Sequence, residues 1–231
     1  QVMVNFAARY GVDAATCLLG TGIEPSQLRD ADALIERDQE MRLVENLILA
    51  LPHVQAPGFQ LGLQYNVATF GTWGFVLRIS RNVIEAMRAA LRYLPLSTAY
   101  CQFTTVLDEH EFSVVAHPQS IPPHLRQFLL ERDTATALNL CHELGLSAFR
   151  VKRIEYQGPA PLHAAQIEAL CGIAPVYRSS RNALVLDRRD ATLEGVDRID
   201  EVGDEQQVDH ESRVVLRADR LLPELARELE S

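Results

Sequence analysis

A cysteine and a histidine stand next to each other at Cys141-His142, and nucleophilic catalysis by a thiolate requires these two residue types. The surrounding segment predicts a helix, in which neighbouring side chains point about 100° apart, so the two cannot pair without other groups. We interpret them as a buried thiol beside a surface imidazole. The chain contains no G-x-S-x-G, no glycine-rich phosphate loop and no H-E-x-x-H motif, and Gly71-Thr72-Trp73-Gly74 lacks the spacing of a dinucleotide fingerprint. The sequence therefore predicts no enzyme.

Histidines, cysteines and acids are also the residue types that bind metals, but their spacing here matches no standard site. The residues considered are His110, His117, His124, His142, His163, Cys17, Cys101, Cys141 and Cys171. Each cysteine stands in apolar or helical surroundings, which favours buried thiols. Glu109 and Glu111 flank His110 at an expected hairpin tip, where charged residues normally meet water. We expect neither a metal nor another cofactor.

Two segments rich in aromatic residues are the candidates for a small-molecule pocket, because such pockets are mostly apolar with a few convergent polar groups. The candidate residues are Phe70, Trp73, Phe75, Leu77, Arg78, Tyr100, Cys101 and Phe103. Tyr100 and Arg78 could supply the polar groups, the latter for a carboxylate or another anion. The alternative stays open that the aromatics are core residues and that Arg78 faces solvent.

Composition indicates a globular protein without a nucleic-acid-binding surface. The 231 residues are 47% hydrophobic and 23% charged, enough for one large domain or a core with an appendage. From Asp187 onward the chain contains fourteen acidic residues and seven arginines, so this tail carries −7 of the net charge of −9. Nowhere do lysines and arginines cluster as phosphate binding demands. No apolar run spans a membrane and the start does not resemble a signal peptide, so we expect a cytoplasmic protein.

Apolar periodicity predicts eight helices, six of which lie in the first half of the chain. Helices are expected over 2–10, 13–19, 36–51, 59–63, 70–77, 82–94, 122–143 and 162–170. The third of these rests on apolar residues spaced by three and four, such as Met41, Val44 and Leu47. Asp13 and Asn82 are expected N-caps.

Alternating and β-branched residues predict strands in the second half. Strands are expected over 100–106, 111–116, 149–156, 175–177 and 183–186. The first two should form a hairpin, and the last two should meet at a turn over 179–182. Because the strands come in adjacent pairs, we expect an α+β fold in which N-terminal helices precede a mainly antiparallel sheet with packed helices. An acidic linker (187–211) and a terminal helix (212–229) should follow.

Four motifs in this order resemble the N-terminal sensor domain of AraC-type transcription regulators. The motifs are Gly11-Val12-Asp13 with Leu18-Leu19-Gly20-Thr21-Gly22-Ile23, Gly58-Phe59-Gln60-Leu61-Gly62-Leu63, Phe70-Gly71-Thr72-Trp73-Gly74-Phe75 and Val83-Ile84-Glu85-Ala86-Met87-Arg88-Ala89-Ala90-Leu91-Arg92-Tyr93-Leu94. They are similar to the arabinose-binding-type branch, with its helical start and α/β core, rather than to the jelly-roll branch. The resemblance spans roughly residues 3–186, whereas the acidic segment 187–211 fits the family poorly.

The resemblance implies a regulatory domain over 1–186, with a helical start (1–80) and an α/β core (81–186). It implies binding of a small effector, homodimerisation, and contact with DNA only through a C-terminal helix-turn-helix domain that this chain lacks, toward which 187–231 would lead. The pocket candidates predict a partly apolar effector, and a sugar or another small metabolite stays open as the alternative. A bacterial cytoplasmic regulator without membrane partners is the expected context. The alternative is an interaction module without a small-molecule site, in which the helix over 82–94 and the tail over 212–229 build a dimer seam.

Overall fold

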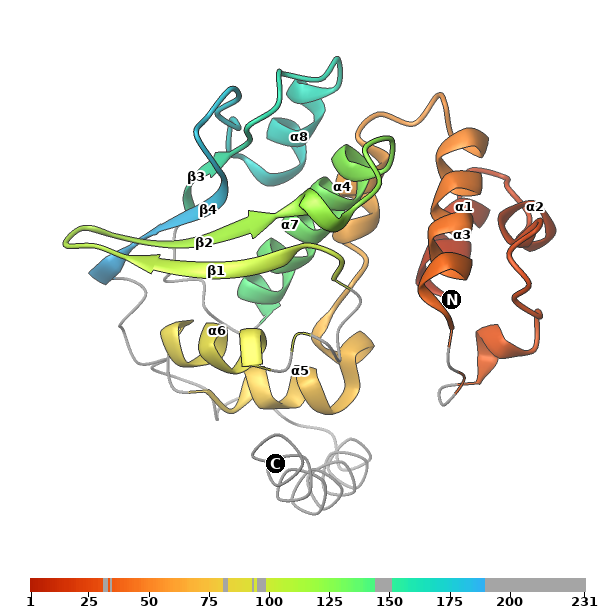
Figure 1. The fold of residues 1–231 in the computed structure, drawn as a ribbon, viewed down its shortest axis with the longest axis horizontal. Helices are drawn as coiled ribbons and strands as arrows, with labels where there is room; N and C mark the ends of the chain where they lie inside the picture. Colours follow the sequence, from red (N-terminus) through yellow and green to blue (C-terminus); the bar gives the residue numbers. More distant parts are fainter. Residues whose placement is uncertain are drawn as a thin grey trace.

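The computed structural model describes residues 1–30, 33, 35–80, 83–92, 94, 99–143 and 151–189. Its elements follow one another as helices first and strands later (Figure 1). In chain order they are α1 (Val2–Ala8), α2 (Ala14–Leu18), η1 (Gln27–Arg29), α3 (Arg37–Ala50), α4 (Pro57–Gly62), η2 (Val67–Phe70), α5 (Gly71–Arg78), α6 (Val83–Arg92), β1 (Gln102–Leu107), β2 (Glu111–His117), η4 (Pro118–Ser120), α7 (Arg126–Glu143), β3 (Val151–Glu155), α8 (Ala164–Cys171) and β4 (Asn182–Asp187). The expected α+β class is confirmed.

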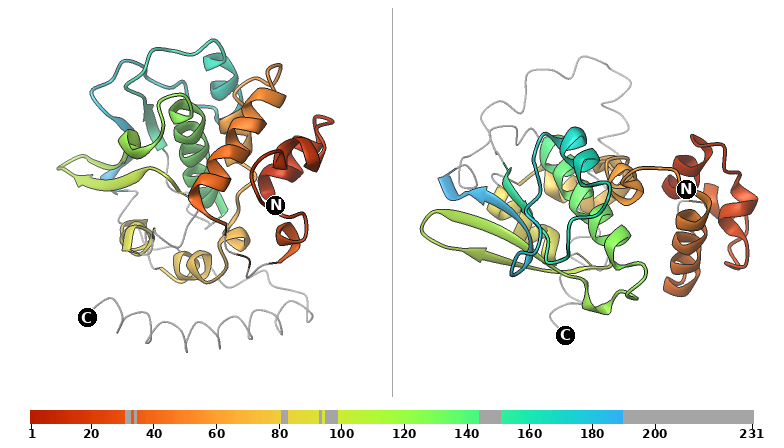
Figure 2. Two further views of the ribbon diagram at one scale, coloured as in Figure 1. Left: turned by 45° about the vertical axis from the view of Figure 1, so that its right-hand side comes forward. Right: turned by 90° about the horizontal axis from the view of Figure 1, so that it is seen from above.

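The helical start is built as its local signals predict. The Asp13 side chain accepts a hydrogen bond of 2.7 Å from the backbone N–H of Thr16, which caps α2. The apolar face of α3 buries Met41, Val44 and Leu47 in the same core as residues of α1, α7 and the sheet. Helices α1–α3 lie together at one end of the molecule, beyond α4 (Figures 1 and 2). The expected cap Asn82 and the expected linker and helix beyond residue 189 lie outside the described residues.

The four described strands form one antiparallel sheet in the order β1-β2-β4-β3. The expected hairpin of β1 and β2 is confirmed, whereas the expected pairing of 175–177 with the last strand is wrong. Both edges of β4 are taken by β2 and β3, so segment 175–177 can only reach the outer side of β3. There Val176 makes an isolated parallel bridge with Glu155.

The glycines of the second motif, Gly58 and Gly62, lie where α4 packs against α7. A Cβ at Gly58 would lie 2.3 Å from the backbone oxygen of Phe128, and one at Gly62 would lie 2.2 Å from that of Arg132. Any side chain at either position would force the two helices apart. This close contact is the physical reason for two glycines spaced by four residues, and it holds α7 in place between α4 and the sheet.

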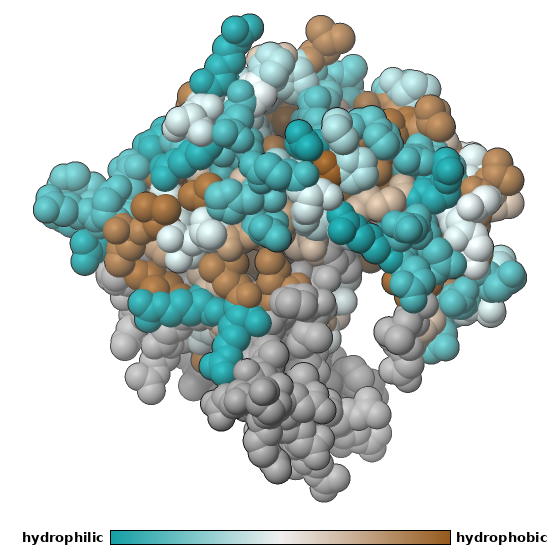
Figure 3. All heavy atoms as spheres, in the orientation of Figure 1, coloured by the Kyte–Doolittle hydropathy of each residue, from teal (hydrophilic) through white to brown (hydrophobic). Residues whose placement is uncertain are grey.

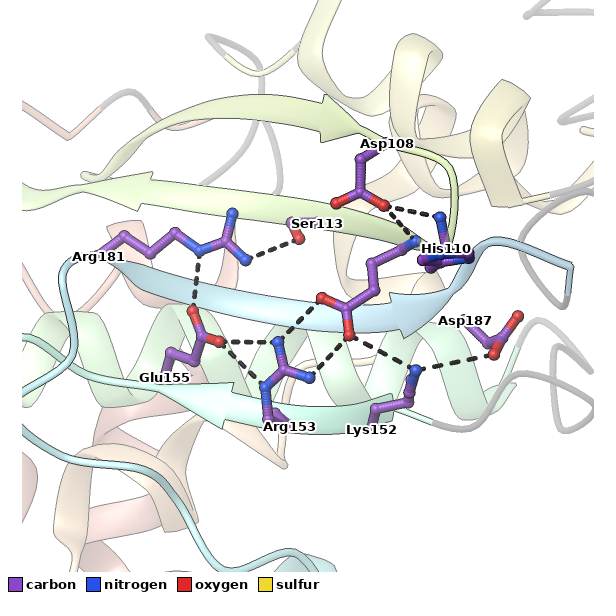
Figure 4. A network of polar contacts seen from close by, with 9 residues as sticks. Asp108, His110, Ser113, Lys152, Arg153, Glu155, Arg181 and Asp187 are labelled. Carbon is purple, nitrogen blue, oxygen red and sulfur yellow. Dashed lines mark hydrogen bonds and ion pairs between the residues drawn. The ribbon is translucent and has the colours of Figure 1, made fainter.

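The two faces of the sheet differ. Phe112 and Val114 of β2 pack with α5, α6 and α7. On the opposite face an ion-pair network crosses β4 (Figure 4): Arg153 pairs with both oxygens of Glu111 at 2.8 and 2.9 Å, and Glu155 joins Arg153 to Arg181. These long side chains lie over apolar residues of the sheet, which remain buried on this face. The helix-covered face is therefore the one that can enclose an apolar site.

Candidate functional site

An apolar cavity of about 80 Å³ lies between the helix pair α5–α6, strands β1 and β2, and the C-terminal half of α7. Its lining consists of Phe70, Leu77, Met87, Ala90, Leu91, Leu94, Ala99, Phe103, Val114, Asp133, Thr136, Ala137 and Leu140. Asp133 and Thr136 are the polar members of this lining. On the surface, hydrophobic residues gather between the β1–β2 hairpin and α6, on the side where the cavity lies (Figure 3).

The residues predicted for the pocket from the sequence divide into four groups, the last of which is Tyr100 and Cys101. Phe70, Leu77 and Phe103 line the cavity. Phe75 is half-buried and Arg78 is exposed, and neither belongs to the lining. The side chain of Trp73 lies outside the described part of the structure.

The two remaining predicted residues, Tyr100 and Cys101, adjoin the cavity through Asp133. Their backbone N–H groups donate to Asp133 Oδ2 at 3.3 and 3.2 Å. One carboxylate thus joins the start of β1 to α7. Burial and the Asp133 carboxylate raise the pKa of the Cys101 thiol well above its ordinary value, so it stays protonated at neutral pH.

Behind the cavity lies a buried cluster around Arg132, which is 1% exposed. Arg132 Nε and Nη2 donate to Asp133 Oδ1 at 3.0 and 2.8 Å, and Arg132 Nη1 lies 3.8 Å from Glu40 Oε1 on α3. The guanidinium also lies 6.0 and 5.4 Å from the ring centres of Tyr65 and Tyr100. A buried charge is tolerated because acids and aromatic rings surround it.

The Arg132 cluster also reaches the helical start of the chain. The Tyr100 hydroxyl donates to Glu40 Oε2 at 2.5 Å. Burial opposes the charge on Arg132, but Asp133, Tyr65 and Glu40 keep its pKa above the ordinary value. Burial raises the pKa of Tyr65 to about 12. At neutral pH the cluster is therefore a structural charge pair with neutral phenols, not a set of groups that exchange protons.

Sequence reasoning did not find the contribution of α7. Asp133 and Thr136 line the cavity from this helix, and Arg132 supports it from behind. A signal was present, because Glu131-Arg132-Asp133 places three adjacent charges between Leu130 and Ala135 of the expected helix. Such charges are seldom buried unless they pair, so these residues could have been proposed as part of a site.

The residues considered for catalysis and metal binding are not gathered into such a site. Burial raises the pKa of Cys141 to about 11, which leaves its thiol protonated at neutral pH, and His142 is exposed. Over the described residues, no three histidines, cysteines or acids lie close enough to hold a metal ion. Within the same residues, no helix is long and apolar enough to cross a membrane.

Comparisons with known proteins agree with the motifs and the fold. The chain is 30% identical over 177 residues to the uncharacterized HTH-type transcriptional regulators Rv1395 of Mycobacterium tuberculosis and Mb1430 of Mycobacterium bovis, covering 77% of this chain and 52% of each relative. Its fold is similar to that in the crystal structure of the transcriptional regulator CdpR from Pseudomonas aeruginosa, with a TM-score of 0.55, 14% identity, and coverage of 84% of this chain and 56% of that one. The chain spans about half the length of these relatives.

The family match covers most of the sequence. Residues 11–194 match the family described as the arabinose-binding domain of AraC transcription regulators, N-terminal. The resemblance carried by the glycine and leucine motifs is thereby confirmed, and the chain belongs to the arabinose-binding domain family of AraC transcription regulators.

Proposed function

We propose that this chain is the effector-sensing domain of a transcription regulator, and that the effector binds in the cavity between α5–α6 and α7. The observation that carries this proposal is an apolar cavity whose acidic residue, Asp133, also pairs with the buried Arg132. A ligand in the cavity is thus in contact with a cluster that extends to Glu40 on α3. Ligand binding can therefore affect the position of α3 in the helical start of the chain.

The cavity favours an apolar group of limited size. Cavities of about 150 Å³ lined by aliphatic and aromatic side chains take up benzene, and the volume here, about 80 Å³, is roughly half of that. A short alkyl chain fits the cavity as it stands. A ring requires α6 to move outward; among the side chains of this helix that the structure describes, Ala86 and Ala90 are buried, whereas Ile84 and Met87 are only partly buried against the core.

Movement of α6 supplies the two states that a sensor needs. A ligand shifts an equilibrium only by the difference between its affinities for two states. An effector that fills the cavity favours the arrangement in which α6 stands further from α7. The Arg132 cluster holds α7, β1 and α3 together, so α6 moves relative to these three elements.

Contact with DNA belongs, in this proposal, to another part of a longer regulator. The relatives named as HTH-type regulators are about twice as long as the matching segment. The chain is acidic, with a net charge of −9, so it offers little attraction for phosphates.

A dimerisation module without an effector is the second candidate. The apolar face of α6, one half of the dimer seam expected from the sequence, packs on Leu77, Phe112 and Leu140 of the same chain. That face is used inside the fold, which favours the sensing proposal. The other half of the seam, segment 212–229, lies outside the described residues.

Substitution of Ala137 tests the sensing proposal. Ala137→Leu places three additional carbons into the cavity, whereas Ala169→Leu places the same group on the exposed face of α8. The probes are straight-chain alcohols and carboxylic acids and substituted benzenes, and binding is measured by thermal shift and calorimetry. We expect a subset of probes to stabilise the wild-type chain and Ala169→Leu but not Ala137→Leu. Failure of every probe, or equal binding to Ala137→Leu, would contradict the proposal.

A further inference from the structure

A second and larger cavity, of about 420 Å³, lies at the other half of α7. It is bounded by η4, the first turns of α7 and the segment that follows β3. Its lining consists of Pro118, Gln119, Pro123, Arg126, Gln127, Leu130, Glu131, Tyr156, Gln157, Gly158, Pro159, Pro161, Tyr177 and Asn182. Among the described residues, none lines both cavities. Four prolines restrict the backbone of the rim, so the shape of this site is largely present before binding.

Three buried donors in this cavity lack partners. The Tyr156 and Tyr177 hydroxyls and Arg126 Nε are inaccessible to solvent and have no hydrogen-bond partner among the described residues. Tyr156 is 6% exposed, and its ring stacks on that of Tyr177 at 5.7 Å and 25°. The Thr134 hydroxyl lies near Tyr156 and interacts with it electrostatically, but its own proton is donated to Leu130 O at 2.7 Å. Buried polar groups are normally paired; these three lie just beneath the lining of the cavity, where a small side-chain shift would let a bound ligand pair with them.

One buried acid faces the same cavity. Glu131 is 4% exposed, and its Oε1 is hydrogen-bonded to His163 Nε2 at 2.8 Å and to Gln127 Nε2 at 3.1 Å. Burial, with a smaller contribution from the Glu131 charge, raises the pKa of Tyr177 to about 12. Burial also raises the pKa of Tyr156 well above its ordinary value, although the Thr134 hydroxyl opposes this rise. Both phenols therefore keep their protons at neutral pH and can donate to a ligand.

Two further polar residues of the lining pair with each other. Asn182 and Gln157 hydrogen-bond to each other through side chain and backbone at 2.9 Å, and Gln157 also donates to Ser180 O. The donors without partners are Arg126 Nε and the two tyrosine hydroxyls, next to one carboxylate at Glu131, whereas Arg126 Nη2 donates to Ile121 O at 3.1 Å. A carboxylate ligand group matches the donors. An ammonium group matches Glu131 and the aromatic rings.

We propose that this cavity binds a small zwitterion of the α-amino acid type, with its carboxylate at Arg126 and the tyrosine hydroxyls and its ammonium group at Glu131. A phosphate ester fits less well, because Arg126 is the one cationic residue of the lining and stands beside a buried acid. A purely apolar ligand would leave the three donors unpaired. The site is separate from the effector cavity, although α7 contributes to both.

Binding of the twenty common amino acids to the 231-residue chain tests this proposal, by thermal shift and then by calorimetry. Tyr156→Phe and Arg126→Gln remove donors and keep most of the packing, and Glu131→Gln removes the charge. Tyr10→Phe is the matched control, because that hydroxyl is paired with Gln60 at 2.7 Å away from the cavity. We expect at least one amino acid to bind, and each cavity variant to weaken it tenfold or more while Tyr10→Phe leaves it unchanged.

Analogues of the bound amino acid, and a variant that fills the effector cavity, test whether binding is specific to this site. The matching amine without its carboxylate, and the matching acid without its amine, should each bind at least tenfold more weakly. Ala137→Leu, which fills the effector cavity, should leave amino-acid binding unchanged, so the two proposals fail separately. The proposal is overturned if no amino acid binds, if Tyr156→Phe binds as the wild type does, or if a single-charge analogue or a neutral sugar binds equally well.

Discussion

The buried pair of Arg132 and Asp133 provides the sharpest test of what holds the site together. Asp133→Asn keeps an oxygen that can accept from the N–H groups of Tyr100 and Cys101 but removes the negative charge. Arg132, at 1% exposure, is then left with Glu40 at 3.8 Å as its acidic neighbour. Breaking a buried pair on one side costs about 3–5 kcal/mol, because the other charge stays in the core. Against a typical total of about 5–15 kcal/mol, we expect a loss of about 3 kcal/mol, which leaves a folded but fragile chain.

Urea unfolding followed by circular dichroism measures this loss, provided that the slope of the transition stays constant. The double variant Arg132→Met with Asp133→Asn removes both charges, so it should recover most of the stability that Asp133→Asn loses. Arg42→Met, in an exposed pair with Glu45, is the control and should change stability by about 0.5 kcal/mol or less. The reasoning fails if Asp133→Asn costs less than about 1 kcal/mol, or if the double variant is the less stable of the two.

Three further variants test the frame of the fold. Gly62→Ala would place a Cβ 2.2 Å from an α7 backbone oxygen, so it should cost about 1–3 kcal/mol or more in urea unfolding, whereas Gly158→Ala, with no atom within 4 Å, should be nearly neutral. Asp13→Ala removes the cap of α2 and should lower the urea midpoint, and an unchanged midpoint would show that the cap contributes nothing. Hydrogen bonds from Arg153 lower the pKa of Glu111 from 4.5 to about 2, so the pair stabilises the fold above pH 4.5 and this contribution is lost as pH falls through 2. Arg153→Gln should therefore flatten the pH dependence of the unfolding midpoint over that window, and an identical acid profile in both proteins would refute the assignment.

Local signals were sufficient for most elements of this fold. The spacing of Met41, Val44 and Leu47 placed α3 correctly, and Asp13 marked the start of α2. Alternation and β-branching located the β1–β2 hairpin, because two neighbouring strands with a short turn pair with each other. Each of these features depends on residues that are close in the sequence.

Local sequence patterns did not predict how segments distant in the chain pack together. Segment 175–177 has the composition of a strand, but β4 had both edges filled by β2 and β3, and pairing partners that far apart in the chain are decided by the packing of the whole sheet. In the same way, of the residues that the sequence predicts for a pocket, Phe70, Leu77 and Phe103 line the cavity, whereas Arg78 is exposed and does not. Side-chain type shows what a residue can contribute, not which way its helix turns it.

The sequence by itself determined the class of fold, the helical start, the hairpin and the family, since periodicity, caps and the order of the glycine motifs are properties of short segments. Tertiary structure alone decided that Gly58 and Gly62 bring α4 against α7, and that α7 carries Arg132 and Asp133 behind one cavity and Glu131 beside another. Burial, hydrogen-bond partners and cavities arise only where distant segments meet, because they depend on which atoms exclude water together.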